Sequence, residues 1–219
     1  MAESQPQFKY RNITISGLPG CGSTTLLRLL RDHQLMQDSG WKGFSGGEFM
    51  RAYAIEKGKF DPSTGHHHSA ADYDDDFDRQ VDMGMRQKLE EEEHWILESW
   101  LSGFLGQQVP GIFKILMTCS DDSVRIDRIM NRDNVSVDEA KNNIHQRYQS
   151  NFTKWQRMYS DKWQQWVVEP GTVPAHDPIA FWRPELYDIV IDTYKINQQE
   201  TLTTVLNAIT KQNTRPLSE

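Results

Sequence analysis

The sequence predicts an α/β fold built on a central parallel sheet, and three observations support this prediction. Short β-branched or apolar runs alternate with segments of helical periodicity, which is the order of parallel β–α units. The first run ends in a glycine-rich turn that leads directly into leucines at helical spacing. Two later runs are nearly continuous in apolar residues, as strands buried on both faces are. The 219 residues suit a single domain, 1–219, that carries insertions.

The elements of the first part of the chain follow from these patterns. The β-branched run at 13–16 predicts a strand, and the leucines within 24–30 predict a helix. The turn-rich stretch 40–47 leads into a second helix over 48–54. Residues 59–76 hold proline, glycine, three consecutive histidines and a run of aspartates, which predicts a surface excursion. Adjacent histidines cannot all face one ion, so solvation or adventitious metal binding is favoured there over a built metal site.

From residue 77 onward, the sequence pattern predicts helices and strands in alternation, with a helix as the last element. At the start of this segment apolar residues recur every four positions, which is typical of an amphipathic helix. A charged, arginine-rich stretch further on is interrupted around 133–136, as two helices would be. The predicted elements are a helix over 78–93, buried strands over 95–98 and 112–117, two helices within 122–158, a Trp- and Pro-rich passage over 162–184, a strand over 187–192 and a helix over 200–209.

Composition excludes several classes of protein. Hydrophobic residues make up 37% and charged residues 25% of the chain, which suits a globular protein. The formal net charge of −7 argues against binding to a nucleic acid polymer or to an acidic membrane surface. No apolar run approaches the length of about 18 residues that a membrane span needs, and the N-terminal residues lack an apolar leader. Because the two cysteines form neither a metal-site spacing nor a disulfide framework, a cytoplasmic location is expected.

The segment 17–25, which reads GLPGCGSTT, has the spacing of a phosphate-binding loop at every position but one. Glycines let successive backbone N–H groups turn inward, and the following helix points its positive end at the same cavity. Ser23 stands where such loops carry a lysine, and loss of that charge would slow transfer more than it weakens binding. The alternative is a strand-to-helix turn that uses glycine only for tightness. The residues expected to hold ATP here are Gly17, Gly20, Gly22, Ser23, Thr24 and Thr25, with the Thr24 hydroxyl on Mg²⁺.

The chain resembles the nucleoside monophosphate kinases, and among them the short archaeal type of cytidylate kinase and its relatives. Besides the loop, the matching segments are FSGGEFMR at 44–51, FDRQVD at 77–82, WILESWLSGF at 95–104, VRIDRIMNR at 124–132, QRY at 146–148 and YDIVIDT at 187–193. The resemblance implies a three-layer P-loop NTPase fold with a central parallel sheet, a helical lid over 125–160 and two surface insertions, over 60–76 and 162–184. It also implies ATP and Mg²⁺ as cofactors, nucleotide ligands, and a monomer or weak homodimer.

On the acceptor side, the resemblance assigns Ser45, Gly46 and Arg51 to the substrate, with Arg51 reaching the phosphate of the acceptor nucleotide. Asp78 belongs to the stretch that is similar to the family's residues near the acceptor base. Trp100 stands where the family's strand and turn carry an arginine that grips the acceptor phosphate. The Trp100 ring would either stack on a base or ribose or, as is commoner for an aromatic residue at the end of a strand, pack against its neighbours.

The remaining candidates are four arginines and one glutamate. Arg125, Arg128 and Arg132 are spaced by three and four and therefore share a helix face, and Arg147 lies on the next helix. The resemblance implies that Arg125 binds the ATP phosphates and that the other three are catalytic cations replacing part of the lost lysine charge. The alternative is a solvated helix that pairs with nearby acids. Glu98 ends an inner strand, where it would hold Mg²⁺ through water or accept a neighbouring backbone N–H.

The activity implied by the resemblance is ATP-dependent phosphoryl transfer to a nucleoside monophosphate such as CMP or dCMP. Two alternatives stay open. The two charges missing at Ser23 and Trp100 would suit a catalytically weak or inactive nucleotide-binding sensor or scaffold. The changes on the acceptor side would equally suit a kinase for a different small acceptor.

Overall fold

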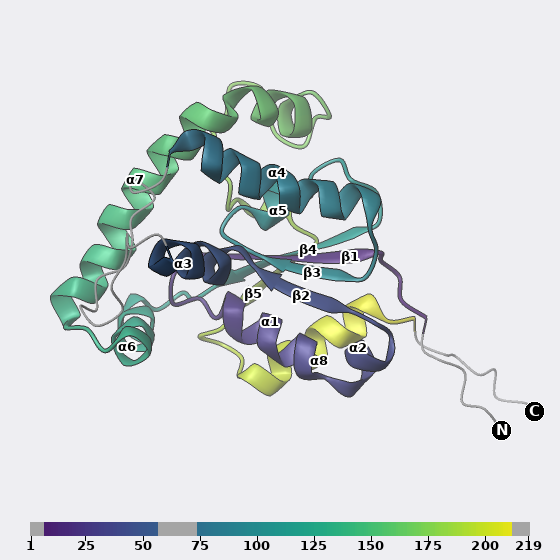
Figure 1. Ribbon diagram of the computed structural model, residues 1–219, viewed down its shortest axis with the longest axis horizontal. Coiled ribbons are helices and arrows are strands. Elements are labelled where there is room, and N and C mark those ends of the chain that lie inside the picture. Colours follow the sequence, from purple (N-terminus) through teal and green to yellow (C-terminus); the bar gives the residue numbers. More distant parts are fainter. Residues whose placement is uncertain (1–6, 57–73, 212–219) are drawn as a thin grey trace, which may run out of the picture.

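The computed structural model describes residues 7–56 and 74–211, and within them five strands form one parallel sheet (Figure 1). The strand order is β2-β3-β1-β4-β5, and every neighbouring pair is parallel. The predicted α/β class with a parallel sheet is confirmed. The expected insertion at 60–76 lies almost entirely outside the described residues. The strands are β1 Asn12–Gly17, β2 Lys42–Ser45, β3 Trp95–Glu98, β4 Ile112–Thr118 and β5 Ile189–Asp192.

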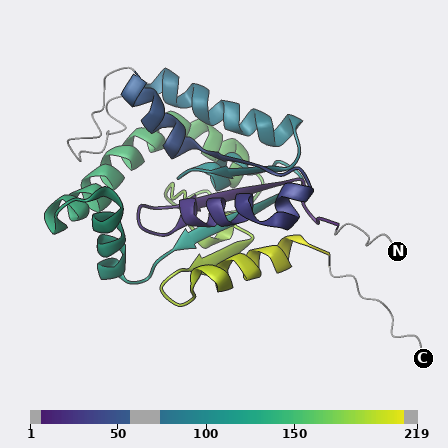
Figure 2. The ribbon, with the colours of Figure 1, turned by 60° about the horizontal axis from the view of Figure 1, so that its bottom comes forward.

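Helices cover both faces of this sheet and produce three layers (Figures 1 and 2). One face carries α1 Ser23–Asp32, α2 Gln34–Asp38 and α8 Gln198–Ile209. The other carries α4 Asp75–Glu91, α5 Ser102–Leu105 and the C-terminal end of α7. The remaining helices are α3 Gly46–Glu56, α6 Asp122–Asp133 and α7 Val137–Trp163, followed by a π-helical turn Gln164–Val168 and a 3₁₀ turn Pro184–Leu186. Within the described ranges, no helix is both long and apolar enough to cross a membrane.

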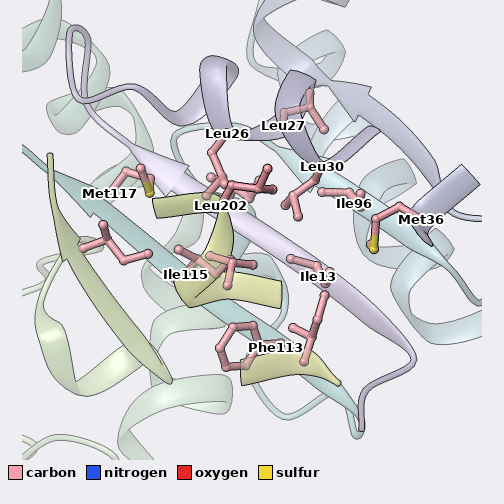
Figure 3. Close-up of a cluster of buried hydrophobic side chains, with 14 of the residues drawn as sticks. Ile13, Leu26, Leu27, Leu30, Met36, Ile96, Phe113, Ile115, Met117 and Leu202 are labelled. Atoms are coloured by element: carbon pink, nitrogen blue, oxygen red, sulfur yellow. The ribbon is translucent and has the colours of Figure 1, made fainter. Parts of the chain in front are cut away.

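The first core lies between the sheet and α1 with α8 (Figure 3). The leucines that predicted α1 fall on its inner side, where Leu26 and Leu30 are buried against Ile13 and Ile15 of β1. Burial of each such side chain contributes about 1.5–3 kcal/mol relative to its exposure. This packing fixes the start of α1 against the carboxyl end of β1, where the glycine-rich turn runs.

The second core corrects the expectation that 162–184 is a surface insertion. Trp163 and Phe181 from this passage are fully buried, and both rings contact Phe104 of α5. The four-residue α5 is too short to cover its face of the sheet alone, so the passage after α7 completes that layer. Of the tryptophans that made the passage distinctive in the sequence, Trp163 and Trp166 are therefore core residues, and Trp182 is partly buried against the same core.

Strand β2 is a second difference, because the stretch 40–47 read as a turn. Its residues pair in register with β3, from Lys42 opposite Trp95 to Ser45 opposite Glu98. Glycine and serine have low strand propensity, so pairing at the edge of an existing sheet, rather than local preference, produces this strand. The register places Ser45 beside Glu98 at the carboxyl end of the sheet.

The break expected between the two arginine-rich helices is confirmed. Asn134 ends α6 in the left-handed conformation, and Ser136 begins α7 with a capping box that includes Glu139. From there α7 runs across the carboxyl end of the sheet to the face that carries α4 (Figure 1). The α6–α7 pair thus occupies the place of the expected lid.

Candidate functional site

A cavity of about 590 Å³ opens at the carboxyl ends of β1 and β3, which is the edge where parallel α/β sheets bind ligands. The turn after β1, the end of β3, and the inner sides of α6, α7 and α8 form its walls. Most of the residues expected at the site line this cavity: Gly17, Gly20, Gly22, Ser23, Thr24, Thr25, Ser45, Arg51, Glu98, Trp100, Arg128, Arg132 and Arg147. Gly46 and Asp78 line a second, adjoining cavity, and Arg125 lines neither.

The turn between β1 and α1 has the backbone of an anion-binding loop. Gly20 and Gly22 have φ values of 81° and 86°, in the left-handed region that favours glycine. A Cβ on Gly20 would lie 2.9 Å from the Arg125 carbonyl oxygen, so the close approach of α6 also requires glycine there. Gly22 is the residue before α1, and because it has no side chain it cannot accept a hydrogen bond from the first N–H groups of that helix. These N–H groups and the positive end of the helix therefore face the cavity, ready for an anion.

The Glu98 carboxylate joins the loop to the end of β2. It is 5% exposed and accepts hydrogen bonds from the hydroxyls of Ser23, at 2.7 Å, and Ser45, at 2.6 Å. The Thr24 hydroxyl donates a longer bond of 3.4 Å. Burial raises the pKa of Glu98, although the hydroxyl donors act against this shift. The partners of Glu98 are thus side-chain hydroxyls, and Ser23, which was expected among the ATP-binding residues of the loop, donates to this carboxylate.

The oxygens of Thr24 and Glu98 fit a magnesium ion. Mg²⁺ prefers hard oxygen donors, keeps several waters and uses one or two protein ligands together with substrate phosphates. The hydroxyl and the carboxylate both line the cavity beside the loop. A carboxylate has about four lone-pair sites, so Glu98 can accept a metal-bound water in addition to its three hydroxyl donors.

The arginines of α6 have different surroundings from one another. Arg128 donates to the carbonyl of Gly20, at 3.1 Å, and to the hydroxyl and carbonyl of Thr193, at 2.7 and 3.0 Å, so it ties α6 to the loop. Arg125 lies behind the loop, where its Nε donates to the Pro19 carbonyl at 3.3 Å and its guanidinium pairs with Asp122. Arg132 faces the cavity and pairs with its neighbour Asp133. Arg128 and Arg132 therefore reach the cavity, whereas Arg125 supports the loop from outside.

The second cavity, of about 100 Å³, adjoins the first, because Gly47, Ser99, Trp100 and Arg147 line both. Its walls hold unusual polar groups. Asp78 is 7% exposed; one carboxylate oxygen accepts from Lys154 at 2.7 Å, and the other has no donor among the described residues. Asn151 is 3% exposed, and its Oδ1 likewise lacks a donor there. Two residues that line this cavity thus each carry a buried acceptor oxygen with no donor among the described residues.

Asp82 also lines the second cavity, and it accepts a 2.6 Å hydrogen bond from the hydroxyl of Tyr159. Burial raises the pKa of Asp82 to about 7. Neither Asp82 nor Asn151 was among the expected site residues. A signal for the latter was present in the sequence, because Arg147, Asn151 and Trp155 are spaced by four and so share one face of α7.

Trp100 packs in an aromatic cluster, as the more conservative interpretation predicted. Its ring contacts those of Trp155 and Trp182 at centroid distances of 5.4 and 6.1 Å. The Cζ atom of Arg147 lies 5.2 Å from the Trp100 ring centroid. Trp100 is therefore both a packed residue and a part of the wall of both cavities.

Together, the parallel sheet, the glycine loop before α1 and the arginines of α6 and α7 define a P-loop nucleotide-binding protein. A protein-family profile described as "AAA domain" matches residues 13–149. The cytidylate kinase of Methanosarcina barkeri is 31% identical over 191 residues, covering 87% of this chain and 91% of that protein. The chain therefore belongs to the cytidylate kinase family, and the resemblance seen in the sequence is confirmed.

Two further similarities agree with this assignment. The cytidylate kinase of Methanopyrus kandleri is 29% identical over 205 residues, covering 90% of this chain and 92% of that protein. An uncharacterized protein from Eubacterium ventriosum has a solved structure that superposes with a TM-score of 0.56 at 14% identity, covering 91% of this chain and 98% of that one. The latter shows a shared fold alone.

Proposed function

We propose that the protein transfers the γ-phosphoryl group of ATP to CMP or dCMP. The observation that carries this proposal is the pair of adjoining cavities, which share four lining residues. The larger one presents the glycine loop, the start of α1 and several arginines to a chain of phosphates. The smaller one is lined by Asp78 and Asn151, each of which has a buried acceptor oxygen without a donor among the described residues. Membership of the cytidylate kinase family supports the same assignment.

The larger cavity suits the donor nucleotide. The N–H groups at the start of α1 bind the phosphates, and the left-handed glycines let the loop wrap around them. Arg128 fixes the position of the loop relative to α6, while Arg132 directs its charge into the cavity. Thr24 and Glu98 would hold a magnesium ion that arrives with ATP, and this ion would neutralise part of the phosphate charge.

The smaller cavity suits a cytosine base. Cytosine carries an exocyclic amino group that donates two hydrogen bonds, and uracil has a carbonyl oxygen at that position. The oxygens of Asp78 and Asn151 that lack donors would receive this amino group, whereas a carbonyl would face two acceptors. Leaving a buried acceptor unpaired costs about 1–3 kcal/mol, so the cavity favours CMP over UMP.

The transfer itself needs the acceptor phosphate in line with the γ-phosphorus. An oxygen of the acceptor phosphate forms the new bond to that phosphorus, and the bond to the bridging oxygen of ATP breaks as ADP leaves. Arg51 and Arg147 line the larger cavity and supply positive charge to the phosphates that meet there. The aromatic residues around Trp100 offer apolar surface at this junction, which would limit the access of water and so the hydrolysis of ATP.

The test is ADP formation from ATP and Mg²⁺ with a panel of acceptors: CMP, dCMP, UMP, AMP and GMP. We expect kcat/KM for CMP or dCMP to exceed that for UMP by about tenfold or more, the equivalent of one lost hydrogen-bond donor. Asp78→Asn should lower the ratio of kcat/KM for CMP to kcat/KM for UMP. Asp188→Asn is the control and should leave this ratio unchanged, because the Asp188 carboxylate pairs with Lys114 on the part of β4 that is remote from the cavities. ADP formation that is independent of the acceptor would contradict the proposal. ATP binding without any transfer would favour the nucleotide sensor.

A further inference from the structure

Arg147 lies at the junction of the two cavities. It projects from α7, which passes across the carboxyl end of the sheet (Figure 1), and it lines the larger and the smaller cavity alike. Any phosphate that passes from a nucleotide in one cavity to a nucleotide in the other must cross this junction. The position of one guanidinium group therefore bears directly on the transfer.

The Trp100 ring provides a fixed surface for that guanidinium. Arg147 Cζ lies 5.2 Å from the ring centroid, within the range of a cation–π interaction, and tryptophan is the best aromatic partner for a cation. The ring in turn packs edge-on against Trp155 at an interplanar angle of 71° and against Trp182 at 72°. The carbonyl oxygen of Trp100 accepts a 2.8 Å hydrogen bond from the Trp182 indole. Trp182 thus contacts both the backbone and the ring of Trp100, and Trp155 of α7 contacts the ring as well.

The residue at position 100 distinguishes this arrangement from the one the resemblance implies. An arginine at this turn would bring its own charge from the end of β3, and it would repel Arg147 at the observed separation. Tryptophan brings no charge, and its negative ring face attracts the guanidinium of α7. Arginine is also the cation best suited to such a contact, because its planar group stacks on an aromatic ring and still offers N–H donors to phosphate.

We propose that Trp100 is a positioning residue that holds the Arg147 guanidinium at the junction of the cavities, so that α7 rather than the end of β3 supplies the grip on the acceptor phosphate. This inference rests on the proposed function, because it assigns the acceptor phosphate to that junction. It gives the aromatic passage after α7 a part in the site, since Trp182 secures the residue that orients Arg147.

Steady-state kinetics of Trp100→Leu and Trp100→Phe test the inference. We expect Trp100→Leu to lower kcat/KM for CMP about tenfold, the equivalent of about 1.4 kcal/mol, with KM for ATP changed less than about twofold. Trp100→Phe retains a ring face and should recover activity to within about threefold of the unaltered protein. Trp95→Leu is the matched control, because Trp95 also faces cations, Lys42 and Lys88, but lines neither cavity.

A double-mutant cycle with Arg147→Lys separates positioning from general packing. If Trp100 acts through Arg147, Trp100→Leu combined with Arg147→Lys should be no more than about twofold worse than Arg147→Lys alone. Effects that multiply, or an equal loss of ATP and CMP with no recovery in Trp100→Phe, would overturn the inference and leave the proposed function standing. If the unaltered protein transfers phosphate to no acceptor, the proposed function fails. In that case, calorimetry of CMP binding tests whether Trp100 positions Arg147. A loss of CMP affinity of about tenfold in Trp100→Leu supports this inference, and unchanged or absent CMP binding overturns it.

Discussion

Glu98→Gln is the most informative single change at the site, because it removes a charge and preserves the shape of the side chain. The carboxylate is buried and accepts three hydroxyl hydrogen bonds. Its pKa is nevertheless raised, so the cost of burying the charge outweighs the stabilisation by its donors. The sign follows from linkage: a group with a raised folded-state pKa contributes less stability as the pH rises through that pKa. Removing the charge should therefore leave the fold intact at alkaline pH.

The magnitude can be worked from the contacts. A hydrogen bond to a charged group contributes about 1.5–3 kcal/mol and a neutral one about 0.5–1.5 kcal/mol, so replacing the three bonds to Glu98 forfeits about 3 kcal/mol in sum. The raised pKa implies that the recovered cost of burial is at least comparable. We expect the free energy of unfolding in urea at about pH 8 to change by less than about 1 kcal/mol. Glu98→Ala leaves the Ser23 and Ser45 hydroxyls without an acceptor and should lose about 2–4 kcal/mol.

Calorimetry of ATP binding supplies the functional half of this prediction. With Mg²⁺, Glu98→Gln should bind ATP about tenfold more weakly, because a neutral amide holds a metal-bound water less well. In EDTA the affinity for ATP should stay equal or rise, because a negative charge next to the phosphates has been removed. A loss of more than about 2 kcal/mol in stability with the magnesium dependence unchanged would refute this reasoning and make Glu98 a structural residue alone.

Three further predictions concern other parts of the molecule. Burial raises the pKa of Asp82 to about 7, so the free energy of unfolding should fall as the pH rises from about 4 to 7. Asp82→Asn should make the free energy of unfolding in urea less dependent on pH across that window, and an unaltered dependence on pH would contradict this prediction. Arg51→Ala should weaken CMP binding about tenfold in calorimetry and spare ATP; equal losses of affinity for CMP and ATP would show that the assignment of Arg51 to the acceptor side is wrong. A Cβ on Gly103 would collide with the Tyr187 ring, so Gly103→Ala should cost about 1–3 kcal/mol, whereas Gly84→Ala, which faces open space in α4, should stabilise; similar thermal midpoints for the two variants would refute the packing argument.

Much of the fold could be predicted because, in most elements, the local sequence pattern and the tertiary packing favour the same secondary structure. The leucines of α1 and the apolar runs of β3 and β4 face the core as their spacing requires. Strand β2 was missed because its glycine and serine oppose strand formation, and only pairing with β3 supplies its hydrogen bonds. The passage at 162–184 was misplaced because proline and turn signals resemble those of a surface loop. Whether its tryptophans are covered depends on how little of the sheet α5 covers, which no local pattern reveals.

At the candidate site, too, the features set by local sequence could be predicted and those set by distant residues could not. The glycine loop was predictable, since its spacing encodes a backbone shape, and the cavity forms around it. The roles of individual side chains were not, because each depends on partners far apart in sequence. Ser23 meets Glu98 across 75 positions, and Arg128 meets Thr193 across 65. Arg125 shares a helix face with Arg128 but lies three residues earlier on α6, where its Nε donates to the Pro19 carbonyl and its side chain does not line the cavity.

The central claim is phosphoryl transfer between two nucleotides across the junction of the cavities. Its most direct test uses ATP labelled in the γ-phosphate, incubated with the protein, Mg²⁺ and CMP, followed by separation of the nucleotides. The account predicts that the label moves into CDP in step with ADP formation and that omission of CMP abolishes ADP formation. Label that stays in ATP, or that is released only as inorganic phosphate, would contradict it.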